Sequence, residues 1–155
     1  MNLTATAIIE EFWDCKLPVD VFYFAERFGF TIKYEESGMG IRDGRLSVKD
    51  KTIQINPMVS DEAKRYAIAH ELGYYCLGYG DTRTETYDLK WIEKTTKEKE
   101  RNVREFVADL LIPPLALKAM IDVRGIKNPI DLRQSFMVQS NLLYYQLKRY
   151  GYAKG

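Results

Sequence analysis

The strand-forming segments of this chain are confined to residues 30–55, and helical patterns lie on both sides of them. Phe30–Tyr34 alternates and contains β-branched residues, and Arg45–Val48 and Thr52–Ile55 are two short strand-type runs separated by a three-residue turn. The two short runs predict a hairpin. Because the strands are grouped between helices, the predicted fold class is α+β, with a small sheet between N-terminal and C-terminal helices.

Helical spacing of apolar residues accounts for most of the remaining chain. Gly29 and Gly151 are predicted to end two of the helices, and the polar segment 81–97, with isolated aromatic residues, is predicted to be a loop. The predicted helices, in chain order, are residues 3–14, 19–28, 60–79, 98–112, 115–123, 130–136 and 140–150.

Length and composition narrow the class of protein. A chain of 155 residues predicts one domain with its own core, here 1–155, with a C-terminal helical pair at 128–152 inside it. The net charge of +1 is too small to attract nucleic acid to the molecule as a whole. No secretory leader and no apolar run near the ~18 residues of a membrane span are found. Cys15 and Cys76 are expected to be reduced, packed thiols of a cytoplasmic protein, with a disulfide between them left open.

The only histidine lies in the run YAIAHELGYYCLGYGD, residues 66–81. Metal-dependent peptide hydrolysis needs two ligands one helical turn apart and a carboxylate beside the first, which the pattern His-Glu-x-x-His supplies. His70 and Glu71 keep the first half of that pattern, but Tyr74 stands where the second histidine belongs. A phenol, with an ordinary pKa of ~10, is a rare zinc ligand. A lone His-Glu pair in a helix is also common by chance.

Two longer motifs carry a family resemblance. Residues 65–79 (RYAIAHELGYYCLGY) resemble the metallopeptidase helix of the ImmA/IrrE family, close to RFTLAHELGHYLLGH, and residues 100–113 (ERNVREFVADLLIP) resemble its second motif, roughly ExEANxFAAELLMP. Residues 17–34, 52–56 and 132–152 are weaker matches. The resemblance implies a zincin-like, gluzincin-type metallopeptidase fold. It also implies kinship with zinc-dependent cytosolic peptidases that cut or unlock a helix-turn-helix repressor, often on phages or mobile elements.

Carried over residue by residue, the resemblance implies an altered site. His70 matches the first zinc ligand and Glu71 the general base, whereas Tyr74 occupies the position of the second ligand. Anchoring the second motif on its LLIP places Asn102 at the third ligand, a glutamate in the family. Zinc prefers imidazole, thiolate or carboxylate over a neutral amide. Tyr79 replaces the histidine that often follows the helix. We therefore expect no cofactor.

The first hypothesis is a catalytically inactive metallopeptidase fold that works by binding a protein. The expected partner is a helix-turn-helix repressor or another DNA-binding regulator of a phage, mobile element or toxin–antitoxin system. Tyr74, Tyr75 and Tyr79 would line or flank the former substrate cleft, since tyrosine is favoured at interfaces. Filling of the vacated pocket is an equally supported role for Tyr74. Without a metal, a buried Glu71 would need a partner such as His70 or Tyr74.

The alternative is an active zinc metalloendopeptidase with rearranged ligands. Glu98 and Glu105 lie four residues before and three residues after Asn102, and Asp109 follows one turn further. One of these carboxylates, with His70 and Tyr74 as phenolate, could complete a zinc site. Their simpler interpretation is as solvated charges on an amphipathic helix.

A third interpretation concerns the tail. Residues 118–155 carry seven basic residues against two acidic ones, a local charge of +5, and residues 140–150 could serve as a DNA-recognition helix. We rank direct nucleic-acid binding below a packed helix pair. The expected buried residues of that pair are Leu142, Leu143, Tyr144 or Tyr145, Leu147 and Tyr150.

Overall fold

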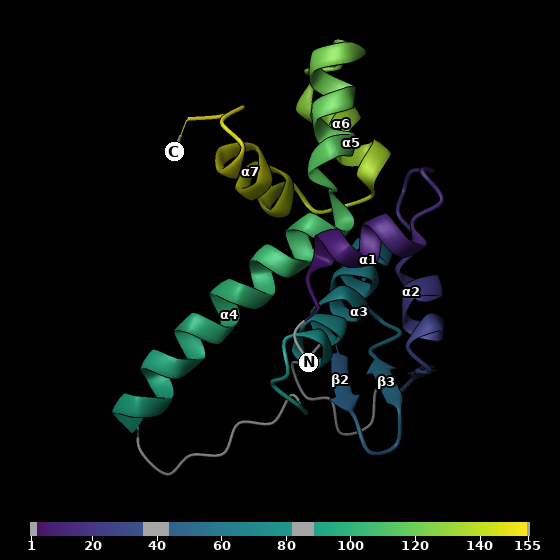
Figure 1. Ribbon diagram of the computed structural model, residues 1–155, viewed down its shortest axis with the longest axis vertical. Coiled ribbons are helices and arrows are strands. Elements are labelled where there is room, and N and C mark those ends of the chain that lie inside the picture. Colours follow the sequence, from purple (N-terminus) through teal and green to yellow (C-terminus); the bar gives the residue numbers. More distant parts are fainter. Residues whose placement is uncertain (1–2, 36–43, 82–88, 155) are drawn as a thin grey trace.

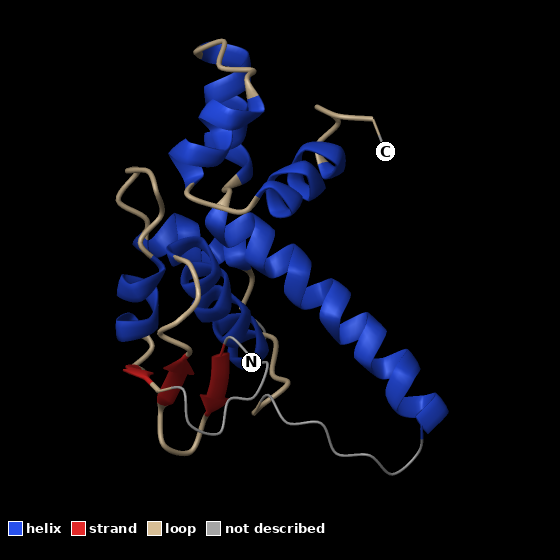
Figure 2. Cartoon of the chain, turned by 180° about the vertical axis from the view of Figure 1, so that it is seen from behind, coloured by secondary structure: helices blue, strands red, loops and turns tan. Residues whose placement is uncertain are grey.

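The computed structural model describes residues 3–35, 44–81 and 89–154, and within the last range it describes side chains from residue 97 onward. Helices form most of the molecule, and a small sheet lies at one end of them (Figure 2). The α+β class is therefore confirmed. The elements are α1 (Ala5–Phe12), α2 (Val21–Arg27), β1 (Thr31–Tyr34), β2 (Gly44–Ser47), β3 (Thr52–Ile55), α3 (Asp61–Cys76), α4 (Leu89–Leu111), α5 (Pro114–Lys118), the π-helical turn η1 (Ala119–Val123), α6 (Pro129–Phe136) and α7 (Ser140–Arg149).

The sheet has the strand order β1-β3-β2. β2 and β3 form the predicted antiparallel hairpin, with Leu46 opposite Ile53, and β1 adds to the free edge of β3 in parallel. Leu46, Ile53 and Ile55 are almost completely buried. One face of the sheet therefore contributes to the core that surrounds α3.

α3 lies between the sheet and α4, so it is buried over most of its surface (Figure 1). Its Gly73 lies where the two helices cross. A Cβ added there would stand 3.1 Å from Cδ1 of Phe106 and 3.3 Å from Cγ1 of Val103. A methyl group here would press on two core side chains of α4, which would have to shift by a few tenths of an ångström to admit it. The glycine of the HELGY run thus fixes how closely α4 approaches His70.

The ends of α3 follow from its sequence. Ser60 caps the first turn, since its Oγ accepts a hydrogen bond from the Ala63 amide at 3.1 Å. Asp61 and Glu62 stand in the first turn, where a helix favours negative charge. Helical structure ends at Cys76, three residues earlier than predicted, and Gly78 follows with a left-handed φ of 78°.

α4 begins earlier than the sequence predicts. The predicted loop over residues 81–97 is wrong for 89–97, and its part at 82–88 lies outside the described residues. Figure 1 shows the first half of α4 extending away from the rest of the molecule. A projecting helix needs no apolar stripe, so the periodicity used for prediction starts only at Val103. The stretch LKWIEKTTK instead contains good helix formers, Leu, Lys and Glu.

The C-terminal helices match the prediction in type and place. The helix expected at 115–123 divides into α5 and η1, and the pair expected within 128–152 is α6 and α7. Leu142, Leu143 and Leu147 are buried as predicted. Of the alternatives Tyr144 and Tyr145, Tyr145 is half-buried against the core and Tyr144 is exposed at 46%. Tyr150 is exposed at 41%, so its place in the buried face was predicted wrongly. Tyr150 follows the last residue of α7, and its hydroxyl still reaches α4.

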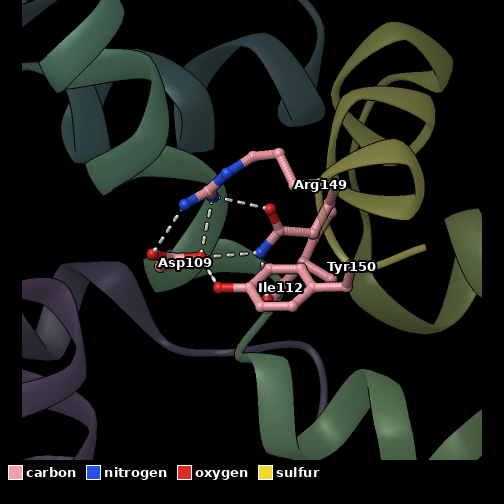
Figure 3. Close-up of polar contacts among 5 residues, drawn as sticks. Asp109, Ile112, Arg149 and Tyr150 are labelled. Carbon is pink, nitrogen blue, oxygen red and sulfur yellow. Dashed lines mark hydrogen bonds and ion pairs between the residues drawn. The ribbon is translucent and has the colours of Figure 1, made fainter. Parts of the chain in front are cut away.

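One polar cluster fastens α7 to α4 (Figure 3). Oδ1 of Asp109 accepts hydrogen bonds from Nε2 of Gln146 at 2.9 Å, Nη1 of Arg149 at 2.9 Å and the Tyr150 hydroxyl at 3.0 Å. Nε2 of Gln146 also donates to the Ile112 carbonyl at 2.9 Å, and this side chain is fully buried. We call Asp109, Gln146, Arg149 and Tyr150 the Asp109 cluster. One of the seven basic residues of the tail, Arg149, is thereby paired with an acid of α4.

The two cysteines differ in their surroundings. Cys76 is buried, and burial raises the pKa of its thiol to about 12. Cys15 is exposed, which contradicts the prediction that both thiols are packed, and both are free. Among the described helices, none has the length and apolar character to cross a membrane.

Candidate functional site

His70 stands on α3 between two carboxylates. Its Nδ1 lies 3.5 Å from Oε1 of Glu71, and its Nε2 lies 3.5 Å from Oε2 of Glu100 on α4. Tyr74, one turn along α3, donates its hydroxyl to Oε1 of Glu100 at 2.8 Å. We call His70, Glu71, Tyr74 and Glu100 the His70 cluster. It lies at the face where α3 meets α4.

The spacing of the α3 residues explains their alignment. Residues four apart stack on one side of a helix, so Tyr66, His70 and Tyr74 form a row. The Tyr66 and His70 rings are stacked with centroids 6.2 Å apart, and the His70 and Tyr74 centroids are 5.2 Å apart. Tyr79 follows after the helix and packs edge-on against Tyr74 at 5.7 Å. The imidazole is therefore one member of an aromatic row.

Glu100 is the α4 residue that contacts His70 and Tyr74, whereas the sequence prediction named Asn102. Anchoring on LLIP placed Asn102 at the third ligand position, but Nδ2 of Asn102 donates to the Tyr79 hydroxyl at 3.0 Å instead. The helical period explains the difference. Val103 packs against Gly73, and Glu100, one turn earlier, shares its face, whereas Asn102 lies about 100° away around the helix. The Val103 stripe was the signal that could have identified Glu100.

The other carboxylates considered from sequence lie elsewhere. Glu98 is exposed, and Glu105 lies near Tyr145 of α7, where its charge contributes after burial to raising the pKa of that phenol. Asp109 belongs to the cluster at the joint with α7. In the part of the chain with described side chains, none of the three contacts His70. Of the α4 side chains from residue 97 onward, Glu100 is the carboxylate that reaches His70.

Tyr75 does not line the site. Its ring packs edge-on against Phe30 at 4.9 Å and Phe28 at 6.0 Å, and its hydroxyl accepts a hydrogen bond from Nζ of Lys51 at 3.1 Å. This places Tyr75 toward α2 and β1. Of the three tyrosines predicted to line or flank the cleft, Tyr74 and Tyr79 are at the His70 cluster and Tyr75 is not.

The two carboxylates determine the charge of the imidazole. Burial alone would lower the pKa of His70, but hydrogen bonds and charge from Glu100 and Glu71 more than offset this and raise it to about 9. The hydrogen bond from His70 in turn lowers the pKa of Glu100, against the effect of burial. At neutral pH His70 is therefore an imidazolium, and the Tyr74 hydroxyl is an additional donor to Glu100.

Glu71 is the least satisfied member of the cluster. Its side chain is 3% exposed, and Oε2 has no hydrogen-bond partner among the described residues. The expected partner His70 is present on Oε1. On the other side, a Cβ added to Gly44 of β2 would lie 3.3 Å from the same Oε1. A buried carboxylate oxygen without a partner is costly, and such groups concentrate at functional sites.

The donor set does not fit the zinc ion that the resemblance implies. Zinc takes nitrogen, sulfur or carboxylate donors, and catalytic sites offer three such protein ligands. His70 and Glu100 supply one nitrogen and one carboxylate. The third position holds Tyr74, which is a protonated phenol here because it donates to Glu100. Within the described residues, no group of three His, Cys, Asp or Glu side chains is arranged to hold a metal ion.

Comparison with known proteins identifies the scaffold. The model of the IrrE N-terminal-like domain family, Peptidase M78, matches residues 25–148, which include α3 and α4. Among solved structures, a Mycobacterium tuberculosis transcriptional regulator superposes on 83% of this chain with a TM-score of 0.62 and 13% sequence identity. This chain spans 39% of the length of that protein, so the likeness concerns the fold. No curated protein is a significant match.

Proposed function

Because this chain belongs to the IrrE N-terminal-like domain family, we propose that it is a catalytically inactive metallopeptidase fold that regulates a partner protein by binding it. The family match confirms the predicted resemblance. The proposed partner is a DNA-binding regulator with a helix-turn-helix domain, and the proposed compartment is the cytoplasm. The regulator named above shares only the fold, so it supports the partner class by analogy.

One observation carries this proposal: Tyr74 donates its hydroxyl to Glu100 at 2.8 Å. In a zinc site the residue one turn after His70 would have to offer a lone pair to the ion. Here it offers a proton to the remaining carboxylate, and that carboxylate also faces His70. The three side chains satisfy one another without a divalent ion. The protein surface around them can then serve for recognition rather than hydrolysis.

Metal analysis tests the inactive site. Purified protein equilibrated with zinc and then desalted is expected to retain well under one ion per chain. Tyr74→His should raise retention to about one ion per chain, because Glu100 already reaches both ligand positions of α3 and would complete a set of two imidazoles and one carboxylate. Tyr74→Phe, the matched control, removes the hydroxyl without adding a ligand and should stay metal-free.

Binding of the partner requires a separate measurement. Candidate helix-turn-helix regulators from the same genome are titrated against the intact chain by calorimetry. Tyr79→Ala, beside the His70 cluster, should weaken binding by about 10-fold or more, as expected for a tyrosine in an interface centre. Tyr34→Ala removes a tyrosine that is 50% exposed on β1 and should leave the affinity within about 2-fold. Equal effects of both substitutions would contradict the proposed surface.

A second candidate function is metal-dependent peptide hydrolysis with rearranged ligands, and the position of Glu100 favours it. Two donors on a tetrahedral zinc ion stand about 3.4 Å apart for bond lengths of about 2.0–2.1 Å, close to the 3.5 Å between His70 and Glu100. This function requires Tyr74 to give up its proton. Stoichiometric zinc in the wild-type chain, with cleavage of a regulator that Glu71→Gln abolishes, would establish hydrolysis and overturn the first proposal.

A further inference from the structure

A groove of about 240 Å³ lies between α3, α4 and α7. Two of its five lining residues are aromatic, and the one charged group among the five is a guanidinium. The lining residues are Tyr66, Arg104, Asn141, Leu142 and Tyr145. Apart from Leu142, which is buried, every one of these side chains offers hydrogen-bonding or π-stacking surface to a ligand.

The groove adjoins the His70 cluster. Tyr66, which forms one wall, stacks on the His70 ring with centroids 6.2 Å apart and an interplanar angle of 26°. Arg104 stands one helical turn after Glu100 on α4, and both residues influence the pKa of Tyr66, which burial raises. A chain segment lying across the His70 cluster therefore meets the groove at Tyr66 and Arg104.

Arg104 lies over an aromatic ring, and its charge also acts on Glu100, one turn earlier on α4, where it contributes to lowering the pKa of that carboxyl. Its guanidinium lies 5.6 Å from the centroid of the Tyr145 ring, and the side chain is exposed. No carboxylate among the described side chains forms an ion pair with it. Arg149 also lies near the Tyr145 ring, at 5.7 Å, but it is paired with Asp109 at 2.9 Å. The two arginines share one ring, and among the described side chains Arg149 is the one of the two that forms an ion pair.

This arrangement suits one kind of ligand. A guanidinium binds a carboxylate through two parallel hydrogen bonds, and its flat stacking surface on tyrosine fixes its orientation. Tyr66 and Tyr145 provide apolar ring surface beside the charge, with Leu142 between α7 and the core. A segment with an acidic side chain next to an apolar one complements both features. An acidic ligand also matches the positive tail of the chain.

We propose that the groove is a recognition subsite for an acidic peptide segment of the partner, in which Arg104 pairs with an aspartate or glutamate and Tyr66 and Tyr145 hold the neighbouring apolar side chain. This inference rests on the proposed function, because it specifies the chemistry of the partner at that site. Arg104 is a specificity-determining residue, and the His70 cluster contributes the adjoining surface.

Selection from a random heptapeptide library displayed on phage tests the subsite with the intact chain as bait. Wild-type protein is expected to enrich peptides with Asp or Glu beside an aromatic or aliphatic residue. The synthetic form of an enriched peptide should bind Arg104→Gln about 10–100-fold more weakly, and Arg104→Lys by an intermediate factor, since a point charge replaces the bidentate contact. Arg101→Gln, the matched control on the exposed side of α4, should bind within about 2-fold of wild type.

Several outcomes overturn the subsite. These are an absence of enriched peptides, enrichment without acidic residues, or equal binding by wild type and Arg104→Gln. Binding of a single-stranded oligonucleotide that depends on Arg104, with no peptide binding, would assign the groove to nucleic acid instead. A regulator that binds wild type and Arg104→Gln equally leaves the proposed function standing and removes the subsite. If the chain binds acidic peptides but no regulator, the subsite stands and the proposed function is removed.

Discussion

α4 contributes to two polar clusters that differ in how completely their hydrogen-bonding groups are paired. The His70 cluster lies near the middle of the helix and the Asp109 cluster near its C-terminal end. In the Asp109 cluster a single carboxylate oxygen accepts three hydrogen bonds at 2.9–3.0 Å, and the buried Gln146 amide is fully used. In the His70 cluster both imidazole nitrogens stand 3.5 Å from their carboxylates, and Oε2 of Glu71 has no partner among the described residues. We call the Asp109 cluster a closed network, because its polar atoms find partners, and the His70 cluster an open network, because a buried oxygen has none among the described residues.

The difference separates two uses of buried polarity. A network in which every member is satisfied stabilises a joint and specifies its geometry. A network that leaves a buried oxygen without a partner costs stability, and natural proteins keep such groups where function requires them. The Asp109 cluster thus has the properties of a structural fastening for α7. The His70 cluster keeps an oxygen without a partner among the described residues, as the proposed functional site would.

The largest expected effect is at the closed network. Asp109→Ala leaves the Gln146 amide, the Arg149 guanidinium and the Tyr150 hydroxyl without their common acceptor. We expect the free energy of unfolding to fall by about 2–3 kcal/mol, because the buried Gln146 amide loses an acceptor, whereas the exposed Arg149 and Tyr150 can turn to water. Urea titration followed by circular dichroism measures the change.

Two controls sharpen that result. Asp109→Asn keeps one acceptor oxygen and should lose about half as much stability as Asp109→Ala. Glu98→Ala removes an exposed carboxylate from the same helix and should stay within about 0.5 kcal/mol of wild type. If Asp109→Ala proves as mild as Glu98→Ala, the cluster is not a fastening and its contrast with the His70 cluster disappears.

The sequence predicts these two regions unequally. Local signals such as the Ser60 cap, the hairpin strands and the glycine after α2 specify elements well, because each depends on a few adjacent residues. Both clusters instead depend on hydrogen bonds between residues that lie 26 to 41 positions apart in the sequence. The register between α3 and α4 decides whether Glu100 or Asn102 faces His70, and Gly73 sets that register by a contact that no linear pattern displays.

The second expected effect distinguishes the clusters by pH. The pKa of His70 is raised to about 9 in the folded chain, against about 6.5 when unfolded. Since the folded value is the higher, the stabilisation is complete below about pH 6.5 and disappears as the pH rises through about 9. The change should be about 1–3 kcal/mol, allowing for the part of the ring that solvent reaches. Urea titrations of wild type and His70→Gln at several pH values measure it.

The Asp109 cluster provides the internal comparison for that titration. Burial lowers the pKa of Arg149, but the hydrogen bond and charge of Asp109 raise it overall, and burial raises the pKa of Tyr150. Neither group changes charge between pH 6.5 and 9, so the cost of Asp109→Asn should stay constant across this range. A wild-type stability that is flat over the same interval, or one that falls equally in His70→Gln, would show that His70 is not held between charged carboxylates.

The smallest expected effect is at the open network. Glu71→Gln removes the charge of a carboxylate whose Oε2 has no partner among described side chains, while it keeps the size of the residue. The substitution weakens the contact with His70, which destabilises the fold. It also removes a charged oxygen that is buried without a partner among the described residues, which stabilises the fold. Because the two effects oppose each other, we expect the free energy of unfolding to change by less than about 1 kcal/mol. The thermal midpoint, measured beside Asp109→Asn, reports this. A loss of about 3 kcal/mol or more from Glu71→Gln would mean that the His70 cluster fastens α3 as firmly as the Asp109 cluster fastens α7.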